Sequence, residues 1–128
     1  MRHVNPPTLS KAVGYTHLVE TAGGRTLYVS GQVSLDPAGK VVGVGDVAAQ
    51  ARQVFENLKA ALAAANASLE HVVKITVFMT DLAGLAAFRA IRSEYFPKQP
   101  PASSLVRVAG LVLPELLIEI EAVAVTPA

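Results

Sequence analysis

The segment 116–125, LLIEIEAVAV, has an alternation that restricts the fold more than any other feature of the chain. One set of alternate positions is uniformly apolar and comprises Leu116, Ile118, Ile120, Ala122 and Ala124. The other set comprises Leu117, Glu119, Glu121, Val123 and Val125. Because side chains alternate along a strand, the first set predicts a face that packs against helices. The second face is also apolar, apart from two carboxylates roughly 7 Å apart. Glutamate is rarely placed among apolar strand residues unless something pairs with it or uses it, so this face is expected to be covered.

The segment 101–125 as a whole is predicted to form a closing pair of strands joined by a turn at 110–114. The N-terminal third is predicted to contain an irregular lead-in (1–14), a short strand (15–19), a glycine turn (23–24) and a strand (26–33). Gly31 inside that last strand indicates a bulge or a close backbone approach. The sequence DPAG at 36–39 predicts a turn before a short returning strand at 40–44.

The middle of the chain predicts two helices separated by a strand. Asp46 caps the first helix, whose apolar residues recur at three- and four-residue steps until Asn66 ends it. A strand at 72–79 follows, with 73, 75, 77 and 79 on the core side, and a second helix runs from about 83 to 96. This order predicts one α+β domain over residues 1–128, with two helices on one face of a mixed sheet.

Composition narrows the function classes. The 128 residues are 52% hydrophobic and 16% charged, with a mean hydropathy of +0.42, which suggests apolar surface buried between subunits. A net charge of +1 provides no strong electrostatic field that would attract nucleic acid or a membrane surface. The absence of cysteine excludes disulfides and thiolate chemistry. We find no signal peptide in MRHVNPPTL and no apolar run of about 18 residues, and therefore expect a cytoplasmic protein.

Two arginines in the second helix lie where a surface helix would not place them. The apolar stripe of this helix comprises Leu85, Phe88, Ile91 and Tyr95. At 100° per residue, Arg92 falls inside the stripe and Arg89 lies at its border. Both side chains could extend along the protein surface to reach solvent while burying their stems. Alternatively, they line a cleft or a subunit interface where an acid or an anionic ligand meets them.

An ordered set of short motifs identifies a family. It comprises Gly14-Tyr15, Val29-Ser30-Gly31-Gln32, Asp36-Pro37-Ala38-Gly39, Gln50 with the sequence 56–59, the strand 72–78, Pro101-Ala102-Ser103-Ser104 and the sequence 118–122. In this order and spacing the set resembles the RidA family, also called YjgF/YER057c/UK114. The resemblance covers almost the whole chain.

The resemblance implies a chorismate-mutase-like fold and a homotrimer. In that assembly the sheets of three subunits form a central barrel, with the helices outside and a cleft at each interface. Archetypal members hydrolyse reactive 2-imino or enamino acids to 2-oxo acids and ammonia, without a cofactor. A covered second face of the sheet, as expected above, agrees with this assembly.

The resemblance also implies site residues. Four positions match the family pocket, namely Tyr15, Ser30, Gly31 and Glu119. Glu119 would position or deprotonate water, or serve as a structural carboxylate across the interface, while Ser30 would donate a hydrogen bond in the pocket. Where the family carries an arginine that grips the substrate carboxylate, this chain has Ser103. Where the family often has an asparagine in the second helix, this chain has Arg89, which becomes the first choice for a relocated carboxylate clamp, with Arg92 second.

The remaining candidates are weaker. His17 shares a strand face with Tyr15 and could reach the cleft, or it could be a structural histidine. Arg107 shares a strand face with Ser103 and could reach the cleft edge, or lie exposed. Three scattered histidines and no cysteine form no metal set, so no metal and no cofactor are expected.

Three functions remain open at this point. The first is an enzyme that hydrolyses a small imine, enamine or related C–N substrate at the interface. The second is a non-catalytic small-molecule binder or chaperone-like protein, which the replacement of arginine by Ser103 favours. The third is the endoribonuclease or translation-inhibitor activity that the family has also been assigned. The net charge of +1, the 5% aromatic content and the lack of a basic run argue against this third function.

Overall fold

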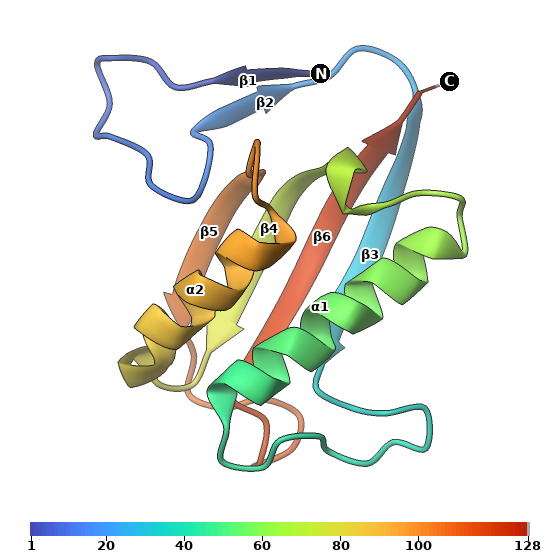
Figure 1. Cartoon of the computed structure of the whole chain (residues 1–128), viewed down its shortest axis with the longest axis vertical. Helices are drawn as coiled ribbons and strands as arrows, with labels where there is room; N and C mark the ends of the chain where they lie inside the picture. The colour runs from blue at the N-terminus through green and yellow to red at the C-terminus, as the bar shows by residue number, and fades with distance from the viewer. Residues whose placement is uncertain (128) are drawn as a thin grey trace.

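The computed structural model describes residues 1–127 as a sheet with two helices on one face and a small strand pair beyond its end (Figure 1). The elements in chain order are β1 (Arg2–Val4), β2 (Leu18–Glu20), β3 (Arg25–Val33), α1 (Val47–Ala63), β4 (Val72–Met79), α2 (Leu85–Tyr95), β5 (Ala102–Arg107) and β6 (Ile118–Thr126). Short 3₁₀ turns at Leu69–His71 and Leu82–Gly84 precede β4 and α2. The predicted α+β class with two helices over a mixed sheet is confirmed.

The main sheet has the strand order β3-β6-β4-β5. β6 pairs antiparallel with both β3 and β4, and β4 pairs parallel with β5. The prediction that the strands of segment 101–125 form a closing pair was therefore wrong, because β4 lies between them. A parallel pair needs a long crossover connection, and α2 provides it between β4 and β5.

The alternation of β6 is confirmed. Its even-numbered residues from Ile118 to Thr126 are buried, whereas its odd-numbered residues are half-buried or exposed. Both helices lie over the buried face, as Figure 1 shows from the helix side. Phe55 of α1 stacks on Phe88 and Tyr95 of α2, with ring centroids 6.3 and 4.7 Å away, and so joins the two helices. The opposite face of the sheet has neither helix on it and is called the open face below.

The first helix begins as predicted and ends slightly earlier. The side chain of Asp46 accepts a hydrogen bond of 3.0 Å from the backbone N–H of Ala49. The helix ends at Ala63, and Asn66, predicted to end it, adopts the left-handed conformation with φ 57° after a turn. The predicted second helix, 83–96, divides into the 3₁₀ turn and α2.

Three local predictions failed at the N-terminal side. The lead-in 1–14 is not wholly irregular, because Arg2–Val4 pairs with Leu18–Glu20, and the strand expected at 15–19 therefore starts only at 18. The expected strand at 40–44 reduces to one bridge between Leu35 and Val41. Gly43 and Gly45, with φ of 76° and 74°, turn the chain out of the extended conformation that a strand needs.

Two strands of the main sheet, β3 and β4, contain irregularities. The register of β3 against β6 shifts between Val29 and Gln32, which confirms the bulge predicted at Gly31. A second shift, between Val72 and Lys74 of β4, places Val72 rather than the predicted Val73 in the core. Within residues 1–127, no helix is long and apolar enough to cross a membrane.

Candidate functional site

Glu119 lies at the start of β6, on the open face. Its strand neighbours are Val33 on β3 and Phe78 on β4, and its side chain is half-buried. Within residues 1–127 no hydrogen bond or ion pair neutralises its carboxylate. A carboxylate in this position remains available as a proton acceptor or as an anchor for water.

The bulge in β3 makes room for that carboxylate. A Cβ placed on Gly31 would lie 2.1 Å from Oε2 and 2.8 Å from the carboxyl carbon of Glu119. The glutamate head therefore packs directly against the glycine backbone, where any other residue would displace it. Ser30 is exposed beside it, and its carbonyl accepts a hydrogen bond of 3.3 Å from the Gln32 side chain. An open groove of about 620 Å³ between β3 and α1 has Gly31 and Asn57 among its lining residues.

A second group of candidate residues is held at the start of β5. The Thr16 backbone N–H donates to the Pro101 carbonyl at 3.1 Å, and the Thr16 hydroxyl donates to the Pro100 carbonyl at 2.6 Å. These bonds hold Tyr15 and His17 beside β5. The two rings meet edge to face with centroids 5.2 Å apart. The Nε2–H of His17 donates to the Ser10 carbonyl at 2.6 Å, which is a structural contact and fixes the orientation of the ring.

Ser103 is half-buried and pairs with Ile75 across the parallel β4–β5 ladder. Because paired residues point to the same face and Ile75 belongs to the core, Ser103 points to the helix side. Arg107 is exposed two same-side positions further along β5, and its Nε donates to the Thr80 carbonyl at 3.4 Å. Glu121 is exposed on the open face, next to Thr76.

The two arginines of α2 differ sharply in burial. Arg89 is exposed, whereas Arg92 is only 7% exposed and its Nε is buried without a hydrogen-bond partner. The Arg92 guanidinium lies 5.5 Å from the ring centroid of Phe88 and packs against Gly14. Burial, and to a lesser extent the neighbouring charge of Arg89, lowers the pKa of Arg92 from its ordinary value.

The predicted residues thus fall into two groups, one on β3 and the adjacent β6 and the other around the start of β5. One group comprises Ser30, Gly31 and Glu119, and the other comprises Tyr15, His17, Arg92 and Ser103. The strand order puts β3 and β5 three strand spacings apart, roughly 14 Å. One chain therefore does not bring the two groups into a single site.

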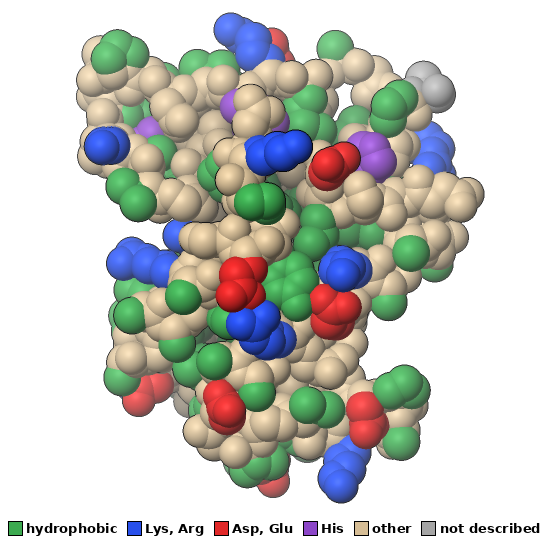
Figure 2. Space-filling view, in the orientation of Figure 1, with side chains coloured by type: hydrophobic (Ala, Val, Ile, Leu, Met, Phe, Trp, Pro, Cys, Tyr) green, Lys and Arg blue, Asp and Glu red, His purple; other side chains and the backbone are tan. Residues whose placement is uncertain are grey.

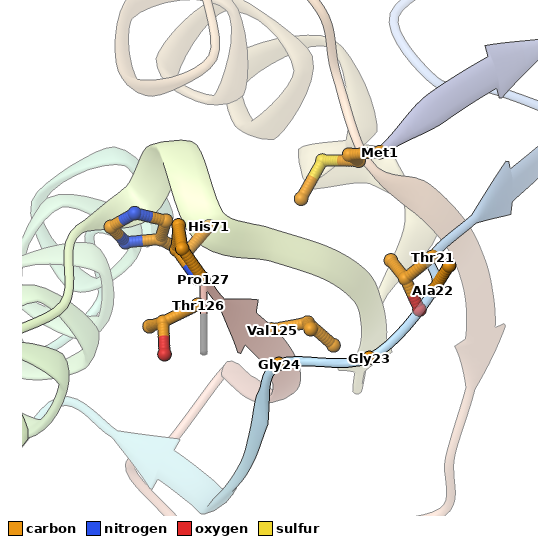
Figure 3. Close-up of a pocket in the computed structure, with 9 residues that line it drawn as sticks. All are labelled: Met1, Thr21, Ala22, Gly23, Gly24, His71, Val125, Thr126 and Pro127. Carbon is orange, nitrogen blue, oxygen red and sulfur yellow. The ribbon is translucent and has the colours of Figure 1, made fainter.

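A separate cavity of about 570 Å³ lies at the far end of β6 from Glu119 (Figure 3). Its lining includes Met1, the Gly23–Gly24 turn and His71, and none of the predicted site residues. The Nδ1 atom of His71 accepts a hydrogen bond of 3.1 Å from the Ser68 backbone N–H, so this nitrogen has a structural role. We therefore do not place the site there.

Charges on the helix face are paired rather than gathered by sign. Figure 2 shows acidic and basic side chains next to each other over the helices. Arg52 of α1 and Glu94 of α2 form an ion pair at 2.6 Å, and Lys59 lies 3.3 Å from Glu56. In the described part of the chain, no three His, Cys, Asp or Glu side chains gather where they could hold a metal ion.

Comparison with known proteins settles the family. A family model described as Endoribonuclease L-PSP matches residues 7–126. The crystal structure of a Rid-family protein from Yersinia pestis superposes with a TM-score of 0.91 at 42% identity, covering 98% of each chain. This chain belongs to the RidA family.

Other relatives also match most of the chain. The chain is 43% identical over 117 residues to protein DfrA of Myxococcus xanthus, covering 91% of this chain and 88% of the relative. It is 41% identical over 119 residues to the 3-aminoacrylate deaminase RutC of Acinetobacter baylyi, covering 93% and 90%. The Escherichia coli YjgF structure superposes with a TM-score of 0.73 at 40% identity, covering 89% and 90%.

Two neighbours of the candidate residues were not singled out from the sequence as parts of the site. Phe78 lies directly beside Glu119 on the open face, and Gly14 packs against the Arg92 guanidinium. The alternation of β4 carries a signal for Phe78, since it places this residue on the face opposite the core. No local pattern reveals the contact of Gly14, because it depends on how a loop folds over a distant helix.

Proposed function

We propose that this RidA-family chain hydrolyses a small imine or enamine acid, giving a 2-oxo acid and ammonia, at a site that two copies share. The observation that carries the proposal is the free carboxylate of Glu119 against Gly31 on the open face. The RutC relative, a 3-aminoacrylate deaminase, supports C–N hydrolysis as the reaction class.

Glu119 has the chemistry that this hydrolysis requires. Its carboxylate takes a proton from water as the oxygen attacks the imine carbon, and the proton then passes to the nitrogen. Collapse of the resulting carbinolamine breaks the C–N bond and releases ammonia with the 2-oxo acid. An enamine substrate first tautomerises to the imine by protonation at carbon.

A homotrimer would complete the site. The open face carries Tyr28, 82% exposed, and Val106, 44% exposed, and it also carries half-buried Phe78 and Val123. Such a face requires a cover. Three copies, each with its β5 edge against the β3 edge of the next, would close their sheets into a barrel with the open faces inside. The same contact brings the group around Ser103 to the group around Glu119.

The test is ammonia release when an imine-generating enzyme supplies the substrate. We expect wild-type protein to accelerate release and Glu119→Gln to abolish the acceleration, because the amide keeps the shape but accepts no proton. Glu121→Gln is the matched control, since Glu121 is exposed on the same strand and face. Equal turnover by Glu119→Gln and wild type would reject the catalytic role.

A non-catalytic binder is the second candidate, and Ser103 favours it. A serine hydroxyl offers one neutral hydrogen bond in place of the charged bidentate fork of the family arginine. Wild-type protein that binds a 2-oxo acid but never accelerates ammonia release would establish this alternative. RNA cleavage is not proposed despite the description of the family model, because the net charge is only +1.

A further inference from the structure

The guanidinium of Arg92, which is largely buried and has one unsatisfied nitrogen, is the strongest unexplained feature of the chain. Its Nε is fully buried with no hydrogen-bond partner, and within residues 1–127 no carboxylate forms an ion pair with it. Burial is the main cause of its lowered pKa, and among residues 1–127 the charged group that adds to this effect is Arg89, which has the same sign. Cation–π contact with Phe88 offsets only part of the cost of burial.

This arrangement is costly unless an anion joins it. An arginine side chain stays protonated in proteins, so the free-energy cost of burying it cannot be avoided by losing the charge. A buried charge without a partner is among the most destabilising features of a folded chain. The guanidinium therefore indicates a carboxylate or similar anion that residues 1–127 of the single chain do not supply.

The position of Arg92 indicates where that anion binds. The guanidinium packs against Gly14, where an added Cβ would lie 2.1 Å from Nη2. Two residues later, Thr16 is bonded to Pro101 and forms a parallel bridge with Ala102, the residue before Ser103. Ser103 points to the helix side of the sheet, the side on which α2 lies. Arg92, Gly14 and Ser103 thus belong to one neighbourhood.

We propose that Arg92 binds the carboxylate of a small 2-imino or 2-oxo acid, with the Ser103 hydroxyl as a neutral second donor. The charged donor then comes from helix α2 rather than from β5. This rests on the proposed function for the class of ligand, although binding and turnover are separable. Burial also reverses the order that the sequence suggested, since Arg89 is exposed and Arg92 is not.

The test uses calorimetric titration of 2-oxobutyrate into full-length wild type, Arg92→Met, Arg92→Lys and Arg89→Met. Arg92→Met keeps the length of the stem and removes the charge, so we expect binding to weaken more than tenfold. Arg92→Lys keeps the charge without the fork and should be intermediate. Arg89→Met, one helical turn away and exposed, is the matched control and should change binding less than twofold. Methyl 2-oxobutyrate, which lacks the negative charge, should not distinguish wild type from Arg92→Met.

Thermal melting without ligand provides a second, independent measurement. Removing an unpaired buried cation should leave the melting temperature of Arg92→Met equal to that of wild type or raise it. A lower melting temperature, or loss of the oligomer, would show that Arg92 pairs with an acid of another copy and would overturn the proposal. Gly14→Ala should also weaken 2-oxobutyrate binding, because its Cβ would displace the guanidinium and because the left-handed backbone at φ 77° disfavours any side chain.

The outcomes separate this inference from the proposed function. Wild type that binds 2-oxobutyrate through Arg92 but releases no ammonia refutes the hydrolase and retains the arginine site. If wild type releases ammonia and Arg92→Met binds 2-oxobutyrate as tightly as wild type does, the arginine site alone is refuted. Wild type that does not bind millimolar 2-oxobutyrate at all also refutes the arginine site.

Discussion

The carboxylate of Glu119 rests on the backbone of Gly31, across the bulge that shifts β3 against β6. The backbone at Gly31 is not in the left-handed region, so an alanine there would strain only its surroundings. Its Cβ would lie 2.1 Å from Oε2 of Glu119 and would displace the carboxylate. The bulge and the proposed catalytic group therefore form one structural unit.

Gly31→Ala should lower the rate of ammonia release at least tenfold while leaving the fold intact. The physical reason is displacement of the reacting carboxylate, for which misplacement by about 1 Å costs on the order of 10²-fold. Steady-state kinetics gives the rate, and circular dichroism with thermal melting reports the fold. Gly110→Ala, whose Cβ would meet no atom within 4 Å and which lies outside both groups of site residues, is the control for the change from glycine to alanine. Equal rates for Gly31→Ala and wild type would show that the close contact is not used.

Gln50→Leu should destabilise the chain by about 1–3 kcal/mol, the usual cost of leaving buried polar groups unsatisfied. Gln50 is fully buried on α1, and its Oε1 accepts from the Leu117 N–H at 2.8 Å. Its Nε2 donates to the carbonyls of Gly43 and Glu115 at 3.1 and 2.9 Å. These bonds fix the loop that leads into β6. Urea unfolding measures the change, and Gln53→Leu, half-buried on the same helix, is the control.

Tyr95→Phe should raise the pKa of Glu56 toward its ordinary value. The Tyr95 hydroxyl donates to Oε2 of Glu56 at 2.7 Å and is the main cause of the lowered pKa of that carboxyl, ahead of Lys59. NMR titration of the glutamate carboxyl carbons measures the shift, and Lys59→Met should move it less. No change in Tyr95→Phe would mean that the hydroxyl is not bonded to Glu56 in solution.

The same pair gives a pH dependence of stability with a definite sign. A carboxyl whose pKa is lowered on folding contributes stability above its unfolded pKa and loses it as pH falls through the folded value. The pKa of Tyr95 is raised by burial and by Glu56, so its contribution is present below the unfolded pKa and lost as pH rises through the folded value. The stability gap between wild type and Tyr95→Phe should therefore be largest between about pH 5 and 9 and narrow outside that window. Urea unfolding from about pH 3 to about pH 11 measures the gap inside and outside this window.

The sequence predicted the elements whose periodicity is strong. The alternation of β6 fixes both of its faces, because a slip by one residue would bury Glu119 and Glu121. The cap at Asp46 and the apolar stripe of α1 locate the first helix, because both signals lie within the helix's own segment of the sequence. Two of the failures share one cause, since the β1–β2 pair and the position of β5 beside β4 depend on partners distant in the sequence. No periodic pattern within a segment carries that information.

For the site, the sequence identified residues but not their grouping. The spacing of 100° per residue along α2 indicated that Arg92 lies within the apolar stripe, and the structure shows this residue buried. The same spacing could not show that Gly14 covers the guanidinium. That contact depends on a loop that Thr16 anchors at the start of β5. Nor could the spacing show that Glu119 and Ser103 lie on strands whose order keeps them apart within one chain.

Val106→Lys should dissociate the proposed homotrimer, whereas Leu82→Lys should not. The two side chains are equally exposed in the single chain, at 44%, so each substitution costs the isolated chain little. Val106 pairs with Phe78 on the open face, in the row of residues that also contains Glu119. Leu82 lies in the 3₁₀ turn before α2. A lysine at Val106 would bury an unpaired charge in the interface only if the open face is covered by another copy.

Light scattering coupled to size exclusion at micromolar concentration measures the assembly. Wild type and Leu82→Lys should elute as trimers and Val106→Lys as a smaller species with unchanged circular dichroism. Val106→Lys should also lose ammonia release, although it alters neither Glu119 nor Arg92, because the two groups of site residues would no longer meet. A wild type that remains monomeric would leave the open face uncovered and refute the shared site. A trimeric Val106→Lys would place the interface elsewhere on the chain.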